Sequence, residues 1–303
     1  MWPSPALLAA LFVVGLAVIA PDATAQGGCP PNSAPAFKQD NTVYCRCVEG
    51  FVRAGDRCEP VVTTPAEPLL SEERERELGR AMSADLNARM TFVTDPRVTI
   101  YMQDLVDLLA RHSTRTGVAY QVRVCNNCVV GACSIACSLP GGAIYISSAF
   151  IRTLSSEAEL AGVLAHEVGH VAARHQAQNL DDRIRAVGLS VLLAGPVWPL
   201  IQDAVFMKFK RDHEREADRS AVEMLYQTRI KPTGLITVFE KIRRTRRPPG
   251  VREALHDTYF ASHPSEQERI RDLEPLLADS RFNEIPSGSS AEYQAMQRRL
   301  ATP

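Results

Sequence analysis

The stretch LAGVLAHEVGHVAARH, residues 160–175, decides the fold of this chain, because it joins an apolar helical pattern to metal-binding side chains. His166 and His170 are four residues apart, so on a helix they lie about 40° apart around the axis and face the same point. Two neutral imidazoles so placed can hold one Zn²⁺, and Glu167 can reach a water on that metal. The stretch therefore predicts a zinc-binding helix.

The alternative interpretation is that the two histidines are surface side chains of an amphipathic helix. The residues around them are apolar on every side, so we expect the helix and its histidines to be buried. A buried imidazole needs a polar partner, and zinc is one. The serine pair at 155–156 predicts the helix start. On a continuous helix His175 lies about 140° from His170, so we expect it to point elsewhere, as a surface or capping residue.

A catalytic zinc site needs a third protein ligand and keeps one position open. Downstream, the run DHEREAD at residues 212–218 places Glu214 and Asp218 on one face of a helix. Glu214 is the expected ligand, and Asp218 is expected to accept a hydrogen bond from a liganding histidine. Glu216 competes for the ligand role, but Ser220 stands four residues after it.

The flanking sequence predicts an α+β fold. A serine N-cap and an acidic first turn predict a helix over residues 71–87, and apolar side chains at helical spacing predict a second helix over 95–112. Residues 118–124 alternate in polarity and residues 143–147 are short and apolar, which predicts two strands. A Pro-Gly-Gly turn at 140–142 precedes the second strand.

The eight cysteines fall into two clusters of four: Cys29, Cys45, Cys47 and Cys58, then Cys125, Cys128, Cys133 and Cys137. The first cluster lies in a short segment that cannot build a core alone, and residues 45–58 resemble half of an EGF-like module. Two disulfides are expected in each cluster, with connectivity left open. A metal site is the alternative in both clusters.

The N-terminus predicts export. Residues 6–20 are apolar, shorter than a membrane span, and are followed by the A-x-A pattern Ala23-Thr24-Ala25. We expect a signal peptide and a periplasmic protein, with secretion as the alternative destination and an uncleaved anchor as the alternative to cleavage. The chain has 34 basic and 35 acidic side chains, a balance that argues against a nucleic-acid partner.

Over residues 71–277 the chain resembles the zinc peptidases of family M48, gluzincins that include the CAAX prenyl protease, HtpX and BepA. Four blocks in the family's order carry the resemblance: LPGGAIYISSAFI at 139–151, HEVGHVAARH at 166–175, EREAD at 214–218 and SHPSEQERI at 262–270. A cysteine-bearing insert stands where the family commonly has an Asn-Ala-Phe-like stretch before Pro-Gly-Gly.

The resemblance implies a ligand set and a base for one Zn²⁺ per chain. His166, His170 and Glu214 would be the ligands, and Glu167 the general base. It also implies a mainly helical zincin-like domain with a small antiparallel sheet. The edge strand of that sheet would bind polypeptide substrates as an added β-strand, and it comprises Ala143, Ile144, Tyr145, Ile146 and Ser147.

Two further site residues are implied by the last block alone, SHPSEQERI at 262–270. By resemblance, His263 lies near the zinc and either stabilises the oxyanion or acts as an inhibitory fourth ligand. Arg269 would brace the site.

The expected function is hydrolysis of unfolded or misassembled cell-envelope proteins by zinc-bound water that Glu167 activates. The alternative is a zinc-bearing chaperone or adaptor in which His263 plugs the metal. Envelope or membrane-surface proteins are possible partners, and no transmembrane span is expected in the mature chain. The expected organisation is a signal peptide over 1–25, a disulfide-stapled cysteine-rich module over 26–60, a proline-rich linker over 61–70, the peptidase domain over 71–277 and a tail over 278–303.

Overall fold

The computed structural model describes residues 33–37, 43–47, 51–54, 57–60, 68–128, 135–187, 208–244, 263 and 266–301. The predicted signal peptide, Cys29, Cys133 and most of the linker lie outside these ranges. The chain divides into two compact units, residues 1–66 and 67–303.

The smaller unit contains two antiparallel hairpins. Strand β1 (Ser33–Phe37) pairs with β2 (Val43–Cys47), and β3 (Phe51–Ala54) pairs with β4 (Arg57–Pro60). A disulfide between Cys47 and Cys58 ties β2 to β4. Cys45 is disulfide-bonded as well. Covalent cross-links therefore hold this short segment together, as expected for one too small to build a core.

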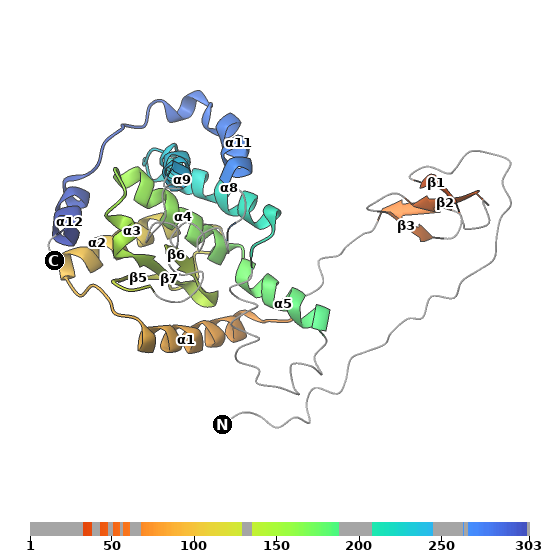
Figure 1. Cartoon of the computed structure of the whole chain (residues 1–303), viewed down its shortest axis with the longest axis horizontal. Coiled ribbons are helices and arrows are strands. Elements are labelled where there is room, and N and C mark those ends of the chain that lie inside the picture. Colours follow the sequence, from red (N-terminus) through yellow and green to blue (C-terminus); the bar gives the residue numbers. More distant parts are fainter. Residues whose placement is uncertain are drawn as a thin grey trace, which may run out of the picture. The chain divides into compact units, whose positions relative to one another are not determined.

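The larger unit is mainly helical (Figure 1). Its helices are α1 (Glu72–Arg89), α2 (Pro96–Ala110), α3 (Ser148–Ile151), α4 (Glu157–Ala172), α5 (His175–Val187), α8 (Arg211–Gln227), α9 (Gly234–Arg244), α11 (Glu266–Leu277) and α12 (Ala291–Ala301), with short 3₁₀ turns η3 (Pro140–Gly142) and η4 (Ser280–Phe282). The predicted helix starts are confirmed by side-chain caps. Ser71, Asp95 and Ser156 each accept a hydrogen bond from a backbone N–H of the first turn.

The sheet differs from the expected one. Its strand order is β5 (Gln121–Cys125), β7 (Ala143–Ser147), β6 (Ala136–Ser138), with β5 parallel and β6 antiparallel to β7. The prediction that residues 143–147 form the edge of an antiparallel sheet is therefore wrong. A third strand, β6, turns back through η3 and takes the edge, where positive φ angles at Gly141 (78°) and Gly142 (109°) allow the turn.

The two outer edges of the sheet differ in whether their backbone groups have hydrogen-bond partners. On β5, the Gln103 side chain donates to Tyr120 O at 2.9 Å and accepts from Val122 N at 3.1 Å, which closes half of the edge. Further along the same edge of β5, Val93 N donates to Val124 O at 2.8 Å. On β6, no strand of the described residues pairs with the outer side.

The sheet lies between two hydrophobic clusters. On one face, Tyr145 packs with Met82 and Leu86 of α1. On the other face, Ile144 and Ile146 join the main core formed with α2, α4, α8 and α9. Helix α4 lies at the centre of this unit, against α8, α9, α2 and β6 (Figure 1). The HEVGH stretch of α4 is thus in the core of the unit.

A buried ion-pair cluster holds α1 in place. Glu75 accepts two hydrogen bonds from the Arg115 guanidinium, at 2.9 and 3.0 Å, and a third from Arg174 Nε at 2.7 Å. Arg115 also reaches Val171 O at 3.3 Å, at the end of α4. Helix α1 is therefore joined to the corner between α4 and α5.

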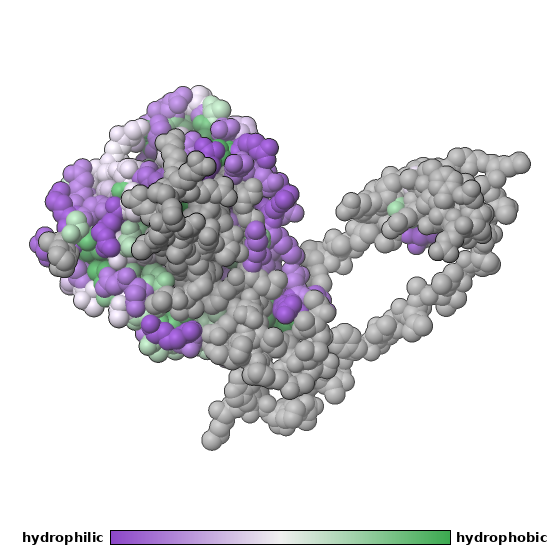
Figure 2. All heavy atoms as spheres, in the orientation of Figure 1, coloured by the Kyte–Doolittle hydropathy of each residue, from purple (hydrophilic) through white to green (hydrophobic). Residues whose placement is uncertain are grey.

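The coloured part of the larger unit in Figure 2 is mainly hydrophilic, with scattered apolar residues. Among the described residues, the large apolar side chains that are exposed are Leu69, Ile100 and Leu276. No described helix has both the length and the apolar content that crossing a bilayer requires.

Candidate metal centre

Close packing between α4 and α8 brings the two parts of the site together. Gly169, inside the HEVGH motif, faces Ala217 of α8, and a Cβ at residue 169 would lie 3.0 Å from Ala217 O. The missing side chain lets the two backbones approach. Glu214, three residues before Ala217, consequently reaches the histidines of α4.

Four buried side chains converge at this point, and they are His166, His170, Glu214 and His263. Their ligand atoms lie within 4.8 Å of one another. His166 Nε2 lies 2.9 Å from His170 Nε2, and the Glu214 oxygens lie 3.6 and 3.4 Å from these two nitrogens. Ligands on a tetrahedral zinc with bonds of about 2.0–2.1 Å are about 3.3 Å apart. The donor set therefore fits zinc in kind and in spacing.

Electrostatics keep two of these groups in the form that metal binding requires. Burial, with the neighbouring His166, holds the pKa of His170 well below its usual value, so its ring is neutral at pH 7. Burial alone would raise the pKa of Glu214, but His263 and Arg269 outweigh it and hold that pKa well below its usual range. A neutral imidazole and an ionised carboxylate are metal-binding forms.

His263 belongs to the same cluster. Its Nδ1 lies 2.9 Å from Glu214 Oε1 and 3.4 Å from His166 Nε2, and its Nε2 lies 3.7 Å from Glu167 Oε1. Burial alone would lower the pKa of His263, but the Glu214 and Glu167 carboxylates raise it. His263 thus stands where a fourth protein ligand would stand.

Asp218 and Arg269 support His166 from behind. Asp218 Oδ1 lies 3.0 Å from His166 Nδ1, so it can accept that N–H while Nε2 points at the cluster. Arg269 donates to both Asp218 oxygens, at 2.8 and 2.6 Å, and its Nη1 lies 2.8 Å from Glu214 Oε2. Arg269 also lies over the Phe239 ring, 4.0 Å from its centroid. Despite burial, Arg269 and His166 lower the pKa of Asp218.

Glu167 is held at one oxygen only. The Ser138 hydroxyl of β6 donates to Glu167 Oε2 at 2.7 Å, and Gln176 Nε2 donates to that hydroxyl oxygen at 2.7 Å. Glu167 Oε1 is buried and makes no hydrogen bond within the described part of the chain. Ser138 and Gln176 were not among the predicted site residues. In the sequence, Ser138 stands two residues before Pro-Gly-Gly, which is the one signal that could have pointed to it.

The expectation for His175 is wrong. It is fully buried, and its Nδ1 lies 2.9 Å from His170 Nδ1. The reason is a break in the helix, because Arg174 has φ 61° and ends the run of α4. A new helix, α5, begins at His175 and returns this side chain toward His170. Glu216, the competing ligand, lies on the far side of His175, with Oε2 3.3 Å from His175 Nε2.

The predicted substrate strand lies away from the four ligands. The side chain of Tyr145 packs toward α1, with its hydroxyl donating to Asn87 Oδ1 at 3.1 Å, while Ile144 and Ile146 are core residues. The strand that contacts the site through a side chain is β6, at Ser138.

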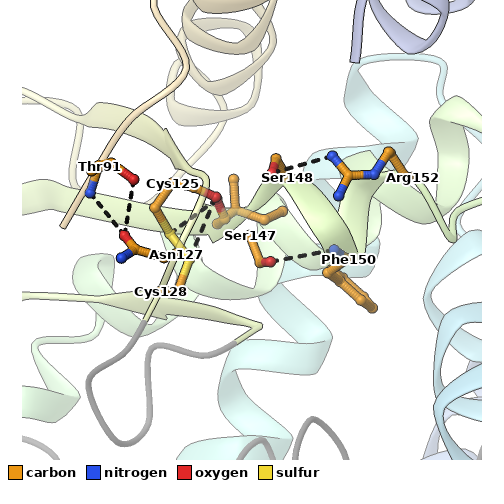
Figure 3. The surroundings of a disulfide bond; sticks show 9 residues. Thr91, Cys125, Asn127, Cys128, Ser147, Ser148, Phe150 and Arg152 are labelled. Carbon is orange, nitrogen blue, oxygen red and sulfur yellow. Dashed lines mark hydrogen bonds between the residues drawn. A yellow bond between two sulfur atoms is a disulfide. The ribbon is translucent and has the colours of Figure 1, made fainter. Parts of the chain in front are cut away.

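The second cysteine cluster contains disulfides rather than a metal site at the residues described. Cys125, at the end of β5, is bonded to Cys128 (Figure 3). Cys137 of β6 is also disulfide-bonded. Asn127, inside the Cys125–Cys128 loop, accepts hydrogen bonds from Thr91 N and Oγ1 at 2.9 and 3.0 Å (Figure 3). The disulfide prediction is confirmed for these three cysteines.

Comparison with known proteins gives a consistent result. The sequence model of peptidase family M48 matches residues 95–276. The chain is 27% identical over 236 residues to the beta-barrel assembly-enhancing protease of Escherichia coli K12, covering 70% of this chain and 46% of that protein. It is 32% identical over 184 residues to the mitochondrial metalloendopeptidase OMA1 of Arabidopsis thaliana, covering 59% of this chain and 35% of that protein. The chain thus spans about half, or less, of these relatives.

Proposed function

This chain belongs to peptidase family M48, and from that premise we propose that it is a zinc-dependent endopeptidase acting on unfolded or misassembled proteins of the cell envelope. One observation carries the proposal. Two imidazoles and a carboxylate converge in a buried cluster, and a second carboxylate, that of Glu167, stands beside them with one oxygen anchored and the other without a hydrogen bond among the described residues.

His166, His170 and Glu214 would hold the zinc. When bound, zinc acts as a Lewis acid that polarises the scissile carbonyl and lowers the pKa of water toward neutrality. Glu167 Oε1 takes the proton of the attacking water and passes it to the leaving amine nitrogen. Ser138, by donating to Oε2, turns the other oxygen toward the cluster.

The substrate would enter as an extended strand along β6. Leu139 N donates to Ala143 O, and Ser147 N donates to Ile135 O, both at 2.8 Å. Because hydrogen-bonded and non-hydrogen-bonded pairs alternate in an antiparallel ladder, Ala136 and Ser138 point their backbone groups away from β7. These groups can pair with a substrate backbone. Ser138 would then contact the substrate through its backbone and Glu167 through its side chain.

The envelope assignment rests on three observations. The N-terminal sequence has the pattern of a signal peptide, and the cysteines that the structure describes in both units are disulfide-bonded, which is typical of oxidising compartments. The relatives in bacteria carry the name beta-barrel assembly-enhancing protease. We propose that the mature chain acts in the periplasm on polypeptide substrates.

Replacement of the base tests the mechanism. Glu167→Gln keeps the size of the side chain and removes its ability to accept a proton, so we expect casein cleavage to fall by about a thousandfold, within the range of about 10²–10⁴ that a general base contributes. Zinc content, measured by atomic absorption, should stay near one per chain. Full cleavage by this variant would contradict the mechanism.

The position of His263 is evidence for a latent form of this enzyme, in which His263 would be a fourth protein ligand of the zinc. With four protein ligands a zinc site is closed, as structural sites are, and the open position needed for catalysis is missing. His263→Ala should therefore raise the rate of casein cleavage several-fold while zinc is retained. A loss of activity would indicate instead that His263 stabilises the oxyanion. Zinc binding with no cleavage, even in this variant, would favour the chaperone or adaptor.

A further inference from the structure

We infer that His175 is a positioning residue of the metal centre, which accepts the Nδ1 proton of His170 and so directs the lone pair of His170 Nε2 at the metal. The inference rests on the proposed zinc site and deepens it. It assigns a role to the residue that follows the positive-φ Arg174 and begins α5.

The geometry determines which atoms carry protons. His170 Nε2 points into the ligand cluster, and its Nδ1 lies 2.9 Å from His175 Nδ1. A metal ligand must present a lone pair, so the proton of neutral His170 is on Nδ1. His170 is then the donor and His175 Nδ1 the acceptor, which leaves the proton of His175 on Nε2.

The contact made by the other ring nitrogen of His175, Nε2, agrees with this assignment of protons. His175 Nε2 lies 3.3 Å from Glu216 Oε2, and a carboxylate can only accept there. The two liganding histidines are thus supported differently, since His166 Nδ1 faces the Asp218 carboxylate directly at 3.0 Å. His170 is connected to a carboxylate through a second imidazole.

Packing holds the His175 ring in this orientation. His175 stacks on His213, with centroids 4.3 Å apart and planes 13° apart. On the other side, Phe209 stacks on His170 with centroids 4.0 Å apart and planes 23° apart. The pair of imidazoles is therefore fixed by aromatic neighbours as well as by the hydrogen bond.

Zinc affinity tests the inference without reference to proteolysis. We would measure it by competition with a chromophoric chelator, using the full-length mature chain. His175→Phe keeps a flat ring against His213 but removes the acceptor, and losing such a supporting partner typically weakens metal binding about 10–100-fold. His175→Asn places Oδ1 where Nδ1 stood, so its affinity should return to within about threefold of wild type.

His213→Phe is the matched control. It changes an imidazole in the same stack, and His213 Nδ1 makes no hydrogen bond within the described residues. Its zinc affinity should equal that of the wild type. Wild-type affinity in His175→Phe, or an Asn variant as weak as the Phe variant, would overturn the inference.

A second measurement uses the unmodified protein, so it does not depend on any variant folding. Nitrogen-15 spectra of the zinc-loaded, histidine-labelled chain report which ring nitrogen carries the proton. We expect a proton on Nδ1 of His170 and on Nε2 of His175, and a proton on Nδ1 of His175 would overturn the inference. Failure of the wild type to bind zinc would be a different result, because it would overturn the proposed function itself.

Discussion

At the scale of single residues, Ser138 connects parts of the site that are far apart in the sequence. It is 29 positions from Glu167 and 38 from Gln176, yet its hydroxyl is hydrogen-bonded to both. A hydrogen bond to a charged acceptor contributes about 1.5–3 kcal/mol. Here that free energy orients the base rather than stabilising the fold.

Ser138→Ala should lower kcat about tenfold and change KM little, because the backbone of Ser138 remains and the orientation of Glu167 is lost. The measurement is steady-state cleavage of a fluorogenic peptide. Ser147→Ala is the control, since this buried serine of β7 caps α3 through Phe150 N and does not touch Glu167. It should lower the free energy of unfolding and leave kcat unchanged. An unchanged kcat in Ser138→Ala would exclude the orienting role.

The pH dependence of stability can be predicted from His213. Burial, together with His175 and Lys210, lowers the pKa of His213 to about 4. The unfolded chain binds this proton below about pH 6.5, whereas the folded chain resists it until about pH 4. Stability contributed by the neutral ring is therefore present above pH 6.5 and is lost as the pH falls toward 4.

In metal-free protein, His213→Phe should flatten the fall in thermal midpoint between pH 6.5 and 4. The exposed His112 supplies the comparison, and His112→Gln should leave the slope as in wild type. Equal slopes in all three proteins would show that His213 titrates normally.

The site residues that could be predicted from the sequence are those that are neighbours at helical spacing. His166 with His170, and Glu214 with Asp218, are i and i+4 pairs, and in the structure each pair shares one face of its helix as the spacing predicts. That the two helices meet at these faces does not follow from the spacing. His175 was misplaced because a left-handed residue breaks the helix at Arg174, and nothing in the identity of an arginine signals that conformation. Ser138 was missed because its contacts cross from a strand to two helices.

At the scale of elements, the helices could be predicted from local sequence signals, whereas the strand order of the sheet could not. The starts of α1 and α4 follow from capping residues, that of α2 follows from helical periodicity, and all three agree with the structure. The sheet order could not be predicted, because β6 has three residues within a cysteine cluster and gives no periodic signal. Because the sequence does not predict β6, it places the strand over residues 143–147 at an edge of the sheet. In the structure this strand lies in the centre.

The position of α1 depends on Glu75. This carboxylate is buried and paired with both Arg115 and Arg174. Glu75→Ala removes the buried carboxylate that Arg115 and Arg174 share and leaves Arg115 with the exposed Glu72 at 3.5 Å, so we expect a loss of about 3–5 kcal/mol in the free energy of unfolding. Urea denaturation measures it. The exposed Glu73, two residues away in the same turn, is the control, and Glu73→Ala should stay within about 0.5 kcal/mol.

At the scale of the whole molecule, the metal and the fold should be coupled. The proposed ligands come from α4 and α8, so zinc would bridge two helices of the core. Zinc at about a hundred times its Kd should stabilise the folded chain by about 2.7 kcal/mol. A chelator should therefore lower the thermal midpoint by several degrees.

Glu214→Gln should lose most of this stabilisation by zinc. Glu223→Gln, on the exposed side of the same helix, should retain it. Calorimetry with and without zinc checks both variants. Equal midpoints for wild type with and without the metal would show that the site is not coupled to folding.

In the proposed mode of substrate binding, the short outer edge of β6 would limit how tightly a polypeptide is held. Two outward residues, Ala136 and Ser138, offer four backbone groups, and one of these, Ser138 O, already accepts from Gln176 Nε2 at 3.3 Å. At about 0.5–1.5 kcal/mol each, such bonds amount to a few kcal/mol, which corresponds to a Kd near the millimolar range. A peptidase that held its substrate in this way alone would bind many polypeptides briefly, and its selectivity would lie in how long a segment stays extended rather than in which residues it contains.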